Sequence, residues 1–240
     1  RPVEKHVKSK QRVADHGEVL TPQWIVNAML DLVKPETERI DSRFLEPACG
    51  TGNFLTEIVE RKLTVVEKRY RKLQLDYERY AILAVSSIYG IDILEDNVRE
   101  CRKRLFDITD RRYSALFKRR CKPKFRQAVR FILERNIIWG DALTLKTVGE
   151  KPGHIVFSEW SLVNGSLMKR RDFTLHGLLP HRQETQRLLF PDFEKPEQLH
   201  LFSDLGEEVF IPVPEQEYPP VHFLKIGDKI SADNTEYADE

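Results

Sequence analysis

The first 150 residues alternate short apolar runs with long helical patterns, and this alternation is the feature that most restricts the fold. The expected strands are 43–46, 87–92 and 136–140, and the expected helices are 53–71, 95–118 and 125–134. An earlier helix is expected to begin near Thr21, because Thr caps helices and the following Pro22 favours a first turn. The order strand, helix, strand, helix, strand is typical of a parallel sheet with crossover helices, so we expect an α/β fold.

The pattern changes after residue 150. Two extended segments, 154–163 and 166–175, flank Asn164-Gly165, which is the strongest signal for a two-residue hairpin turn. Turn-forming residues, acids and prolines then predominate, so we expect an irregular arm and not a second compact domain. The predicted regions are a sheet-forming domain with a helical lead-in (1–150), a β-hairpin insertion (151–180) and a proline-rich acidic arm (181–240) with a disordered tail from 229.

Composition indicates a water-soluble chain. Charged residues make up 32% of the sequence, and no run approaches the 18 consecutive apolar residues of a membrane span. The first residues are polar and lack an apolar signal core, so export is not expected. Cys49, Cys101 and Cys121 match neither a disulfide framework nor a metal-ligand spacing, and the histidines show no such spacing either. We expect a reduced, cytoplasmic protein without a bound metal.

Charge is distributed unevenly along the chain, although the net charge is +1. Residues 99–135 contain 14 Lys and Arg against 4 Asp and Glu, whereas 181–240 contain 5 against 14. The basic segment could follow a phosphate backbone, or it could be an ordinary solvated helix face. The charge pattern alone leaves both interpretations open.

A glycine-containing turn lies between the first expected strand and the helix that follows it. Gly50 and Gly52 would let backbone N–H groups approach a ligand closely, and the start of the helix would favour negative charge. Asp92 and Asp141 end the second and third expected strands, so all three features should meet at one edge of the sheet. Each aspartate alone is equally well explained as a cap of the following helix.

The residues around this turn resemble a known family. The stretch Leu45-Glu46-Pro47-Ala48-Cys49-Gly50-Thr51-Gly52-Asn53-Phe54-Leu55 is similar to motif I of the N6-adenine DNA methyltransferases of restriction-modification systems, usually written Asp-Pro-Ala-Cys-Gly-Thr-Gly-x-Phe-Leu. Upstream, Gly17-Glu18-Val19-Leu20-Thr21-Pro22 resembles the motif that these enzymes place before motif I. The similarity covers about residues 8–145 and implies a class I, Rossmann-like methyltransferase fold with S-adenosyl-L-methionine (AdoMet) as cofactor.

The resemblance also implies which residues would contact the cofactor. On the methionine side they are Leu20, Thr21 and Pro22, with Glu46, Ala48, Gly50 and Gly52 around the methionine moiety. Asp92 would hold the ribose and Ile93 would flank the adenine, while Asp141 would accept from the adenine amino group beside Ala142. Three cations after the hairpin turn, Lys169, Arg170 and Arg171, could contact DNA phosphates or simply solubilise a protruding hairpin.

The family's catalytic motif, Asn-Pro-Pro-Tyr or a near variant, does not occur in the 240 residues. We therefore expect the AdoMet-binding part of a split or truncated adenine methyltransferase that acts on double-stranded DNA. A second polypeptide would supply the catalytic motif and target recognition, and would cover the open edge of the half-sheet.

The main alternative is a non-catalytic, AdoMet-binding regulatory protein, which the missing motif favours. A methyltransferase with a protein or small-molecule substrate would need another catalytic residue, for which Glu159 is the candidate. A dinucleotide enzyme is disfavoured, because no third glycine completes the Gly-x-Gly-x-x-Gly pattern.

Overall fold

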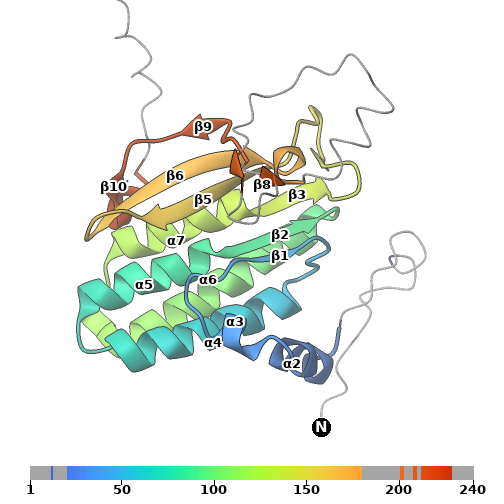
Figure 1. Cartoon of the computed structure of the whole chain (residues 1–240). Helices are drawn as coiled ribbons and strands as arrows, with labels where there is room; N and C mark the ends of the chain where they lie inside the picture. The colour runs from blue at the N-terminus through green and yellow to red at the C-terminus, as the bar shows by residue number, and fades with distance from the viewer. Residues whose placement is uncertain (1–11, 13–20, 180–200, 203–207, 210–211, 229–240) are drawn as a thin grey trace, which may run out of the picture.

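The computed structural model describes residue 12, residues 21–179, two short strands at 201–202 and 208–209, and residues 212–228. Within these residues, helices lie against one face of a central four-stranded sheet, and a second sheet lies over the other side (Figure 1). The central sheet has the strand order β1-β2-β3-β4, and the second has β10-β6-β5 with β9 also paired to β6.

The elements of the first 150 residues follow the sequence closely. The strands are β1 (Phe44–Glu46), β2 (Ile88–Asp92), β3 (Ile137–Asp141) and β4 (Lys146–Thr147). The helices are α2 (Gln23–Asp31), α3 (Lys34–Thr37), α4 (Asn53–Tyr70), α5 (Gln74–Ser86), α6 (Glu95–Phe117) and α7 (Pro123–Asn136), with a 3-10 turn η1 (Lys118–Arg120). Three expected strands and four expected helices are confirmed to within a few residues.

Helix α5 was not predicted from the sequence, because its apolar residues do not form a single stripe. Its buried positions include Glu78, whose side chain accepts hydrogen bonds from Gln74 at 2.8 Å and Lys122 at 2.7 Å. A buried carboxylate needs partners of this kind, and here they come from the same helix and from the start of α7. A helix buried on several sides loses the periodicity by which sequence analysis finds helices.

The parallel arrangement of the first three strands is confirmed. Phe44 pairs with Ile88, and Gly90 pairs with Ile137, both in parallel register. Strand β4 pairs antiparallel with β3, so the sheet is mixed. The fold is therefore α/β and compatible with a Rossmann-like arrangement.

The central sheet is buried on both faces. Ile88 belongs to the core shared with the helices, whereas Tyr89 and Ile91 pack in a second core with residues of β5. The alternation follows from the two-residue period of a strand. Because both faces of β2 are buried, all five of its residues are shielded from solvent, as expected for an internal parallel strand.

The predicted hairpin is present as β5 (Val156–Leu162) and β6 (Leu167–Thr174), but its turn is displaced by one residue. The backbone N–H of Leu167 donates to the carbonyl of Asn164 at 2.9 Å, so Gly165 and Ser166 occupy the centre of the turn. Gly165 has φ +56°, the left-handed conformation that glycine tolerates best. The hairpin does not protrude: Trp160 and Met168, near its turn, are buried in the core with the helices, and Phe157 at its other end packs on Tyr89 with ring centroids 5.3 Å apart.

Part of the predicted arm is regular. Residues 212–228 contain β9 (Gln216–Glu217) and β10 (Val221–His222), both paired with β6, and a 3-10 turn η3 (Phe223–Lys225) packed on α7. Most of 212–228 is outside regular elements, as expected for an irregular arm, but two dipeptides of it pair with β6 and Phe223 is fully buried. The other short elements of the described residues are η2 (His176–Leu178), β7 (Leu201–Phe202) and β8 (Glu208–Val209). The expected tail at 229–240 and most of 181–211 lie outside the described residues.

No helix among the described residues is long and apolar enough to cross a membrane. The same residues contain no group of three or more His, Cys, Asp or Glu side chains arranged to hold a metal ion.

Candidate cofactor-binding site

The turn from β1 into α4 adopts a conformation that requires its glycines. Gly50 has φ +52° and Gly52 has φ +86°, both in the left-handed region. A Cβ atom on Gly52 would lie 2.6 Å from Sγ of Cys101, so a larger residue there meets both backbone strain and a buried neighbour. At this turn the backbone of Gly52 packs directly against Cys101 of α6. The turn leads into α4, which begins at Asn53.

Asp92 joins the end of β2 to the same turn. One carboxylate oxygen accepts a hydrogen bond from the backbone N–H of Gly50 at 2.8 Å. The other accepts from the backbone N–H of Leu94 at 2.9 Å and from the side-chain amide of Asn97 at 3.2 Å. A carboxylate offers about four lone-pair positions, so Oδ2 retains capacity for a further donor such as a hydroxyl group. Asp92 therefore holds the glycine turn against the segment that leads into α6, without capping that helix, and its Oδ2 keeps one acceptor position.

Glu46, at the end of β1, is a half-buried carboxylate. Burial raises the pKa of Glu46, and a hydrogen bond from the backbone N–H of Ala48 opposes this effect at a long distance of 3.4 Å. A carboxylate with a raised pKa gains stability when a cation approaches. This property fits the ammonium group of an amino acid moiety.

Asp141 lies at the end of β3 and organises the local turn. Its carboxylate accepts hydrogen bonds from the backbone N–H of Leu143 at 2.8 Å and from the hydroxyl of Thr144 at 3.0 Å. The backbone bond is the main reason that the pKa of Asp141 is lowered. No helix follows, since the chain continues into β4, so the alternative that Asp141 caps a helix is wrong. Ala142 follows in the same turn and is half-buried.

Two large apolar side chains beside the aspartates are exposed. Ile93 is 47% exposed and Leu143 is 80% exposed. The indole N–H of Trp139 donates to the carbonyl of Ile93 at 2.9 Å, which fixes the backbone after β2. Exposed apolar side chains next to hydrogen-bonding groups are suited to the faces of a planar ring. The sequence predicted Ile93 as a residue beside the ligand but did not predict Leu143. An apolar residue two positions after the aspartate that ends a strand could have pointed to Leu143.

Thr21 and Pro22 lie next to the turn, at the start of α2. The side-chain amide of Asn53, the first residue of α4, donates to the carbonyl of Thr21 at 2.9 Å. Hydrogen bonds therefore connect Thr21 with the start of α4 and Asp92 with Gly50, whereas no hydrogen bond among the described residues joins Asp141 to the turn. Leu20 lies outside the described residues.

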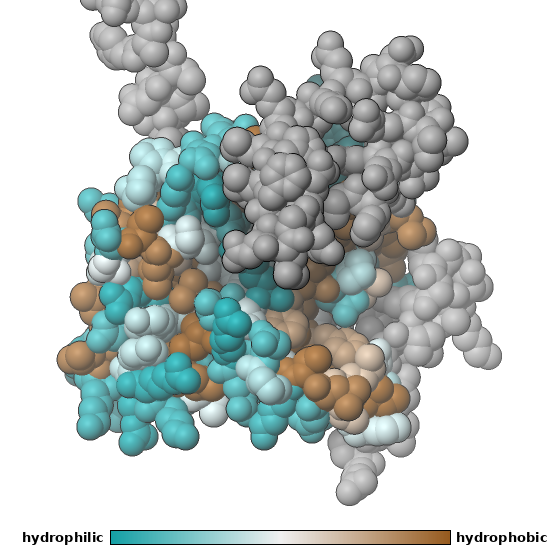
Figure 2. All heavy atoms as spheres, viewed as in Figure 1, coloured by the Kyte–Doolittle hydropathy of each residue, from teal (hydrophilic) through white to brown (hydrophobic). Residues whose placement is uncertain are grey.

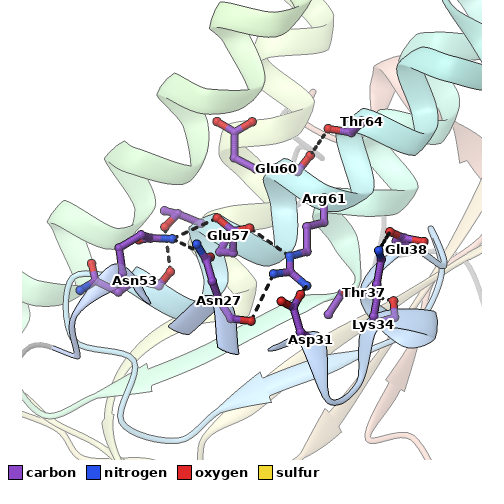
Figure 3. Close-up of polar contacts among 12 residues, drawn as sticks. Asn27, Asp31, Lys34, Thr37, Glu38, Asn53, Glu57, Glu60, Arg61 and Thr64 are labelled. Atoms are coloured by element: carbon purple, nitrogen blue, oxygen red, sulfur yellow. Dashed lines mark hydrogen bonds and ion pairs between the residues drawn. The ribbon is translucent and has the colours of Figure 1, made fainter. Parts of the chain in front are cut away.

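Helix α2 is also fastened to α4 farther along. Arg61 of α4 points toward α2 and pairs with Asp31 at 2.8 Å, while its Nε donates to Glu57 at 3.0 Å (Figure 3). Gln23 donates to Glu57 at 3.0 Å. Several polar contacts thus set the position of the lead-in helix relative to the site.

Arg12, the one described residue before position 21, reaches the start of α6. Its guanidinium pairs with Asp96 at 2.7 Å and donates to the side-chain oxygen of Asn97 at 3.2 Å. Because Asn97 donates to Asp92, the lead-in contacts the same polar network as the glycine turn.

Seven of the 14 cations in the basic segment 99–135 form ion pairs within the described residues. Its ion pairs include Lys103–Asp107, Arg111–Glu60, Arg112–Glu67, Lys122–Glu78, Lys124–Asp228 and Arg126–Asp110. The exposed cations of η1 follow the carboxyl end of the 23-residue helix α6, about 35 Å from its start near Asp92. The cations of η1 are therefore too far from the glycine turn to hold DNA around a base placed there.

The three cations of the hairpin are engaged as well. Lys169 pairs with Glu217 at 2.6 Å, Arg171 pairs with Glu159 at 2.6 Å, and Arg170 donates to Asp172 at 2.8 Å. Their predicted contact with DNA stays a prediction, and it would require these pairs to be exchanged for phosphates. Glu159, the candidate for another catalytic residue, also pairs with Arg43, so it lies in an ion-pair cluster away from the glycine turn.

An apolar cavity lies beside β1. It has a volume of about 330 Å³, and its walls include Phe44, Leu45, Phe157 and Phe173. Among the described residues, β1 is an end strand paired only with β2. The N–H of Phe44 donates toward β2, so the N–H and C=O of Leu45 point to the unpaired side.

Comparison of the chain with protein-family models, with curated proteins and with solved structures gives no match. The functional argument therefore depends on the residues and on their geometry.

Proposed function

We propose that this chain is the AdoMet-binding part of an N6-adenine DNA methyltransferase of a restriction-modification system. The observation that carries the proposal is the connection between the glycine turn after β1 and Asp92 at the end of β2, with Glu46 half-buried beside them. The motif resemblance of residues 45–55 supports the same assignment.

The residues present fit the cofactor. AdoMet would supply the methyl group that is transferred to the adenine amine. Glu46 would pair with the methionine ammonium, Asp92 would accept from the ribose hydroxyls, and Ile93 and Leu143 would flank the adenine ring. Holding one reactant in a fixed orientation lowers the entropy cost of methyl transfer, so this chain contributes positioning and not acid–base chemistry.

The catalytic Asn-Pro-Pro-Tyr motif and target recognition would come from a partner polypeptide. The unpaired edge of β1 and the apolar cavity beside it fit a partner that adds an extended segment to the sheet. Such a segment, placed next to β1, would bring its end close to Glu46 and hence to the cofactor. Double-stranded DNA would then be bound by the complex.

A non-catalytic regulatory protein with the same pocket is the second candidate, and the absence of the tetrapeptide favours it. Methylation assays of the complex distinguish the two. Transfer of labelled methyl groups from AdoMet to DNA adenine, seen only when the partner is present, supports the enzyme.

The first experiment is calorimetric titration of the chain with AdoMet. We expect saturable binding near one equivalent and a loss of affinity of about tenfold or more in Asp92→Ala. Asp107→Ala is the matched control, because Asp107 is exposed on α6 and pairs only with Lys103 among the contacts described. Equal affinity in all three proteins, or no binding to the wild type, would contradict the proposal.

A further inference from the structure

Two side chains to which no cofactor contact was assigned, Asn53 and Arg104, hold the carbonyl of Thr21 in a hydrogen-bonded relay. The amide nitrogen of Asn53 donates to this carbonyl at 2.9 Å, and the amide oxygen of Asn53 accepts from Arg104 at 2.8 Å. Arginine only donates hydrogen bonds and a carbonyl only accepts them, so the amide of Asn53 can satisfy both neighbours in one orientation alone. Asn53 therefore joins α6 to the lead-in segment.

Arg104 also fixes the glycine turn itself. The same guanidinium nitrogen donates to the backbone carbonyl of Thr51 at 2.7 Å and lies 3.1 Å from the Thr51 hydroxyl. Thr51 separates Gly50 from Gly52 and is buried. One cation thus contacts both the turn and the residue that anchors Thr21.

The position of the relay links two sides of the candidate pocket. Thr21 and Pro22 begin α2, and the backbone N–H groups of Ile25 and Val26 both donate to the carbonyl of Pro22. On the other side, Asp92 holds Gly50. The position of the Thr21 carbonyl against the turn therefore depends on Asn53 and Arg104. Gln23 fastens the start of α2 to Glu57 of α4, and the contacts of Arg61 act at the far end of α2.

We infer that Asn53, oriented by Arg104, is a positioning residue that holds the Thr21–Pro22 segment against the glycine turn and thereby sets the affinity for the cofactor. The effect on affinity rests on the proposed function, whereas the anchoring of Thr21 does not. Because the anchor can be measured in the free protein, the two parts are tested separately.

Asn53→Asp is the sharpest variant. It is isosteric, keeps and strengthens the acceptor for Arg104, and removes the side-chain donor to the carbonyl of Thr21. An acidic residue is favourable in the first turn of a helix, so α4 should form normally. The added negative charge attracts a cationic ligand, so a fall in AdoMet affinity could not be attributed to charge repulsion.

The experiment combines hydrogen–deuterium exchange of the free chain with calorimetric titration of AdoMet. Asn53→Asp and Arg104→Met should increase exchange about tenfold in peptides covering 21–30, leave β5 and β6 unchanged, and weaken AdoMet binding about tenfold. Arg99→Met is the matched control, because Arg99 lies on the same helix in an exposed pair with Glu95 and should leave both readouts unchanged.

Unchanged exchange over 21–30 in Asn53→Asp would overturn the anchoring. Increased exchange with wild-type AdoMet affinity would overturn the positioning role. If the wild type does not bind AdoMet, the proposed function fails, and the exchange data alone decide whether Asn53 anchors Thr21. Should Arg104→Met not fold, Asn53→Asp with the intact Arg104 carries the test.

Discussion

The carboxylate of Asp92 accepts a hydrogen bond from the backbone N–H of Gly50 at 2.8 Å. Two residues 42 positions apart thereby connect the ends of adjacent parallel strands at the edge where ligands of α/β sheets bind. The bond also means that Asp92 has a structural role in the free protein, which any test of ligand binding must separate from its role toward a ligand.

Asp92→Asn should separate these roles. Its amide oxygen can still accept from the backbone N–H of Leu94, whereas its NH₂ group faces another donor at Gly50. We expect a loss of about 1–2 kcal/mol in the free energy of unfolding and a loss of AdoMet affinity of tenfold or more. Urea unfolding and calorimetry measure the two quantities. A large loss of stability with unchanged affinity would make Asp92 purely structural.

Glu46→Gln should have opposite effects on stability and binding. Burial raises the pKa of Glu46, so the ionised form costs free energy in the folded protein at neutral pH. Removing the charge should leave the melting temperature unchanged or higher, while AdoMet affinity falls about tenfold because the ammonium loses its partner. In the wild type, affinity should also fall as pH drops through the raised pKa. A variant that melts earlier and binds normally would refute this assignment.

Gly52→Ala should destabilise the turn for two separable reasons. The new Cβ would lie 2.6 Å from Sγ of Cys101, and φ +86° is strained for alanine. We expect a loss of about 1–3 kcal/mol in unfolding free energy. The double variant Gly52→Ala with Cys101→Ala removes the clash but keeps the strain, so its effect should be smaller than the sum of the two single effects. Simple additivity would show that Cys101 does not oppose the new methyl group.

Lys62 should make stability depend on pH. This fully buried side chain donates to the carbonyls of Ile40 and Ser42 and to the hydroxyl of Ser87. Burial lowers the pKa of Lys62 from its ordinary 10.5 to about 7. Between these values the unfolded chain binds more protons than the folded one, so stability rises with pH from about 7 toward 10 and is constant below 7.

The measurement is the free energy of unfolding of wild type and Lys62→Met at several pH values. The difference should shift in favour of the wild type by slightly less than about 1.4 kcal/mol per pH unit between pH 7.5 and 9.5, since about 1.4 kcal/mol is the value for one full proton. Subtracting the variant removes the contribution of other groups. Parallel pH profiles would mean that Lys62 titrates at its ordinary pKa.

Leu45→Lys should block the partner without affecting the cofactor. Leu45 is 47% exposed on the unpaired edge of β1, and an edge lysine opposes the addition of another strand. The variant should bind AdoMet as the wild type does but fail to co-elute, on size exclusion, with a polypeptide carrying Asn-Pro-Pro-Tyr. Leu73→Lys is the control, since Leu73 is 64% exposed at the start of α5. Co-elution of both variants would place the interface elsewhere.

An exposed apolar surface on α2 lies apart from this edge. Figure 2 shows apolar side chains gathered over the helix. Trp24 within the helix is 71% exposed, and Leu32, which follows its last residue, is 84% exposed. A salt- or detergent-dependent change in solution behaviour of Trp24→Ser would reveal whether this face takes part in association.

Local patterns in the sequence determined most of the first 150 residues. Strands β1, β2 and β3, the glycine turn and the aspartates that end two strands are recognisable because side-chain periodicity and turn chemistry act over a few residues. The hairpin was recognisable for the same reason, although its turn is centred on Gly165 and Ser166.

Tertiary structure decided what depends on contacts far apart in the chain. Helix α5 is buried on several sides around Glu78, and residues 216–217 and 221–222 become short strands because they pair with β6. The relay from Arg104 through Asn53 to Thr21 joins three segments that no local pattern relates. A buried polar group must find its partner wherever the fold places one, and that place is set by packing of the whole chain, which no window of sequence contains.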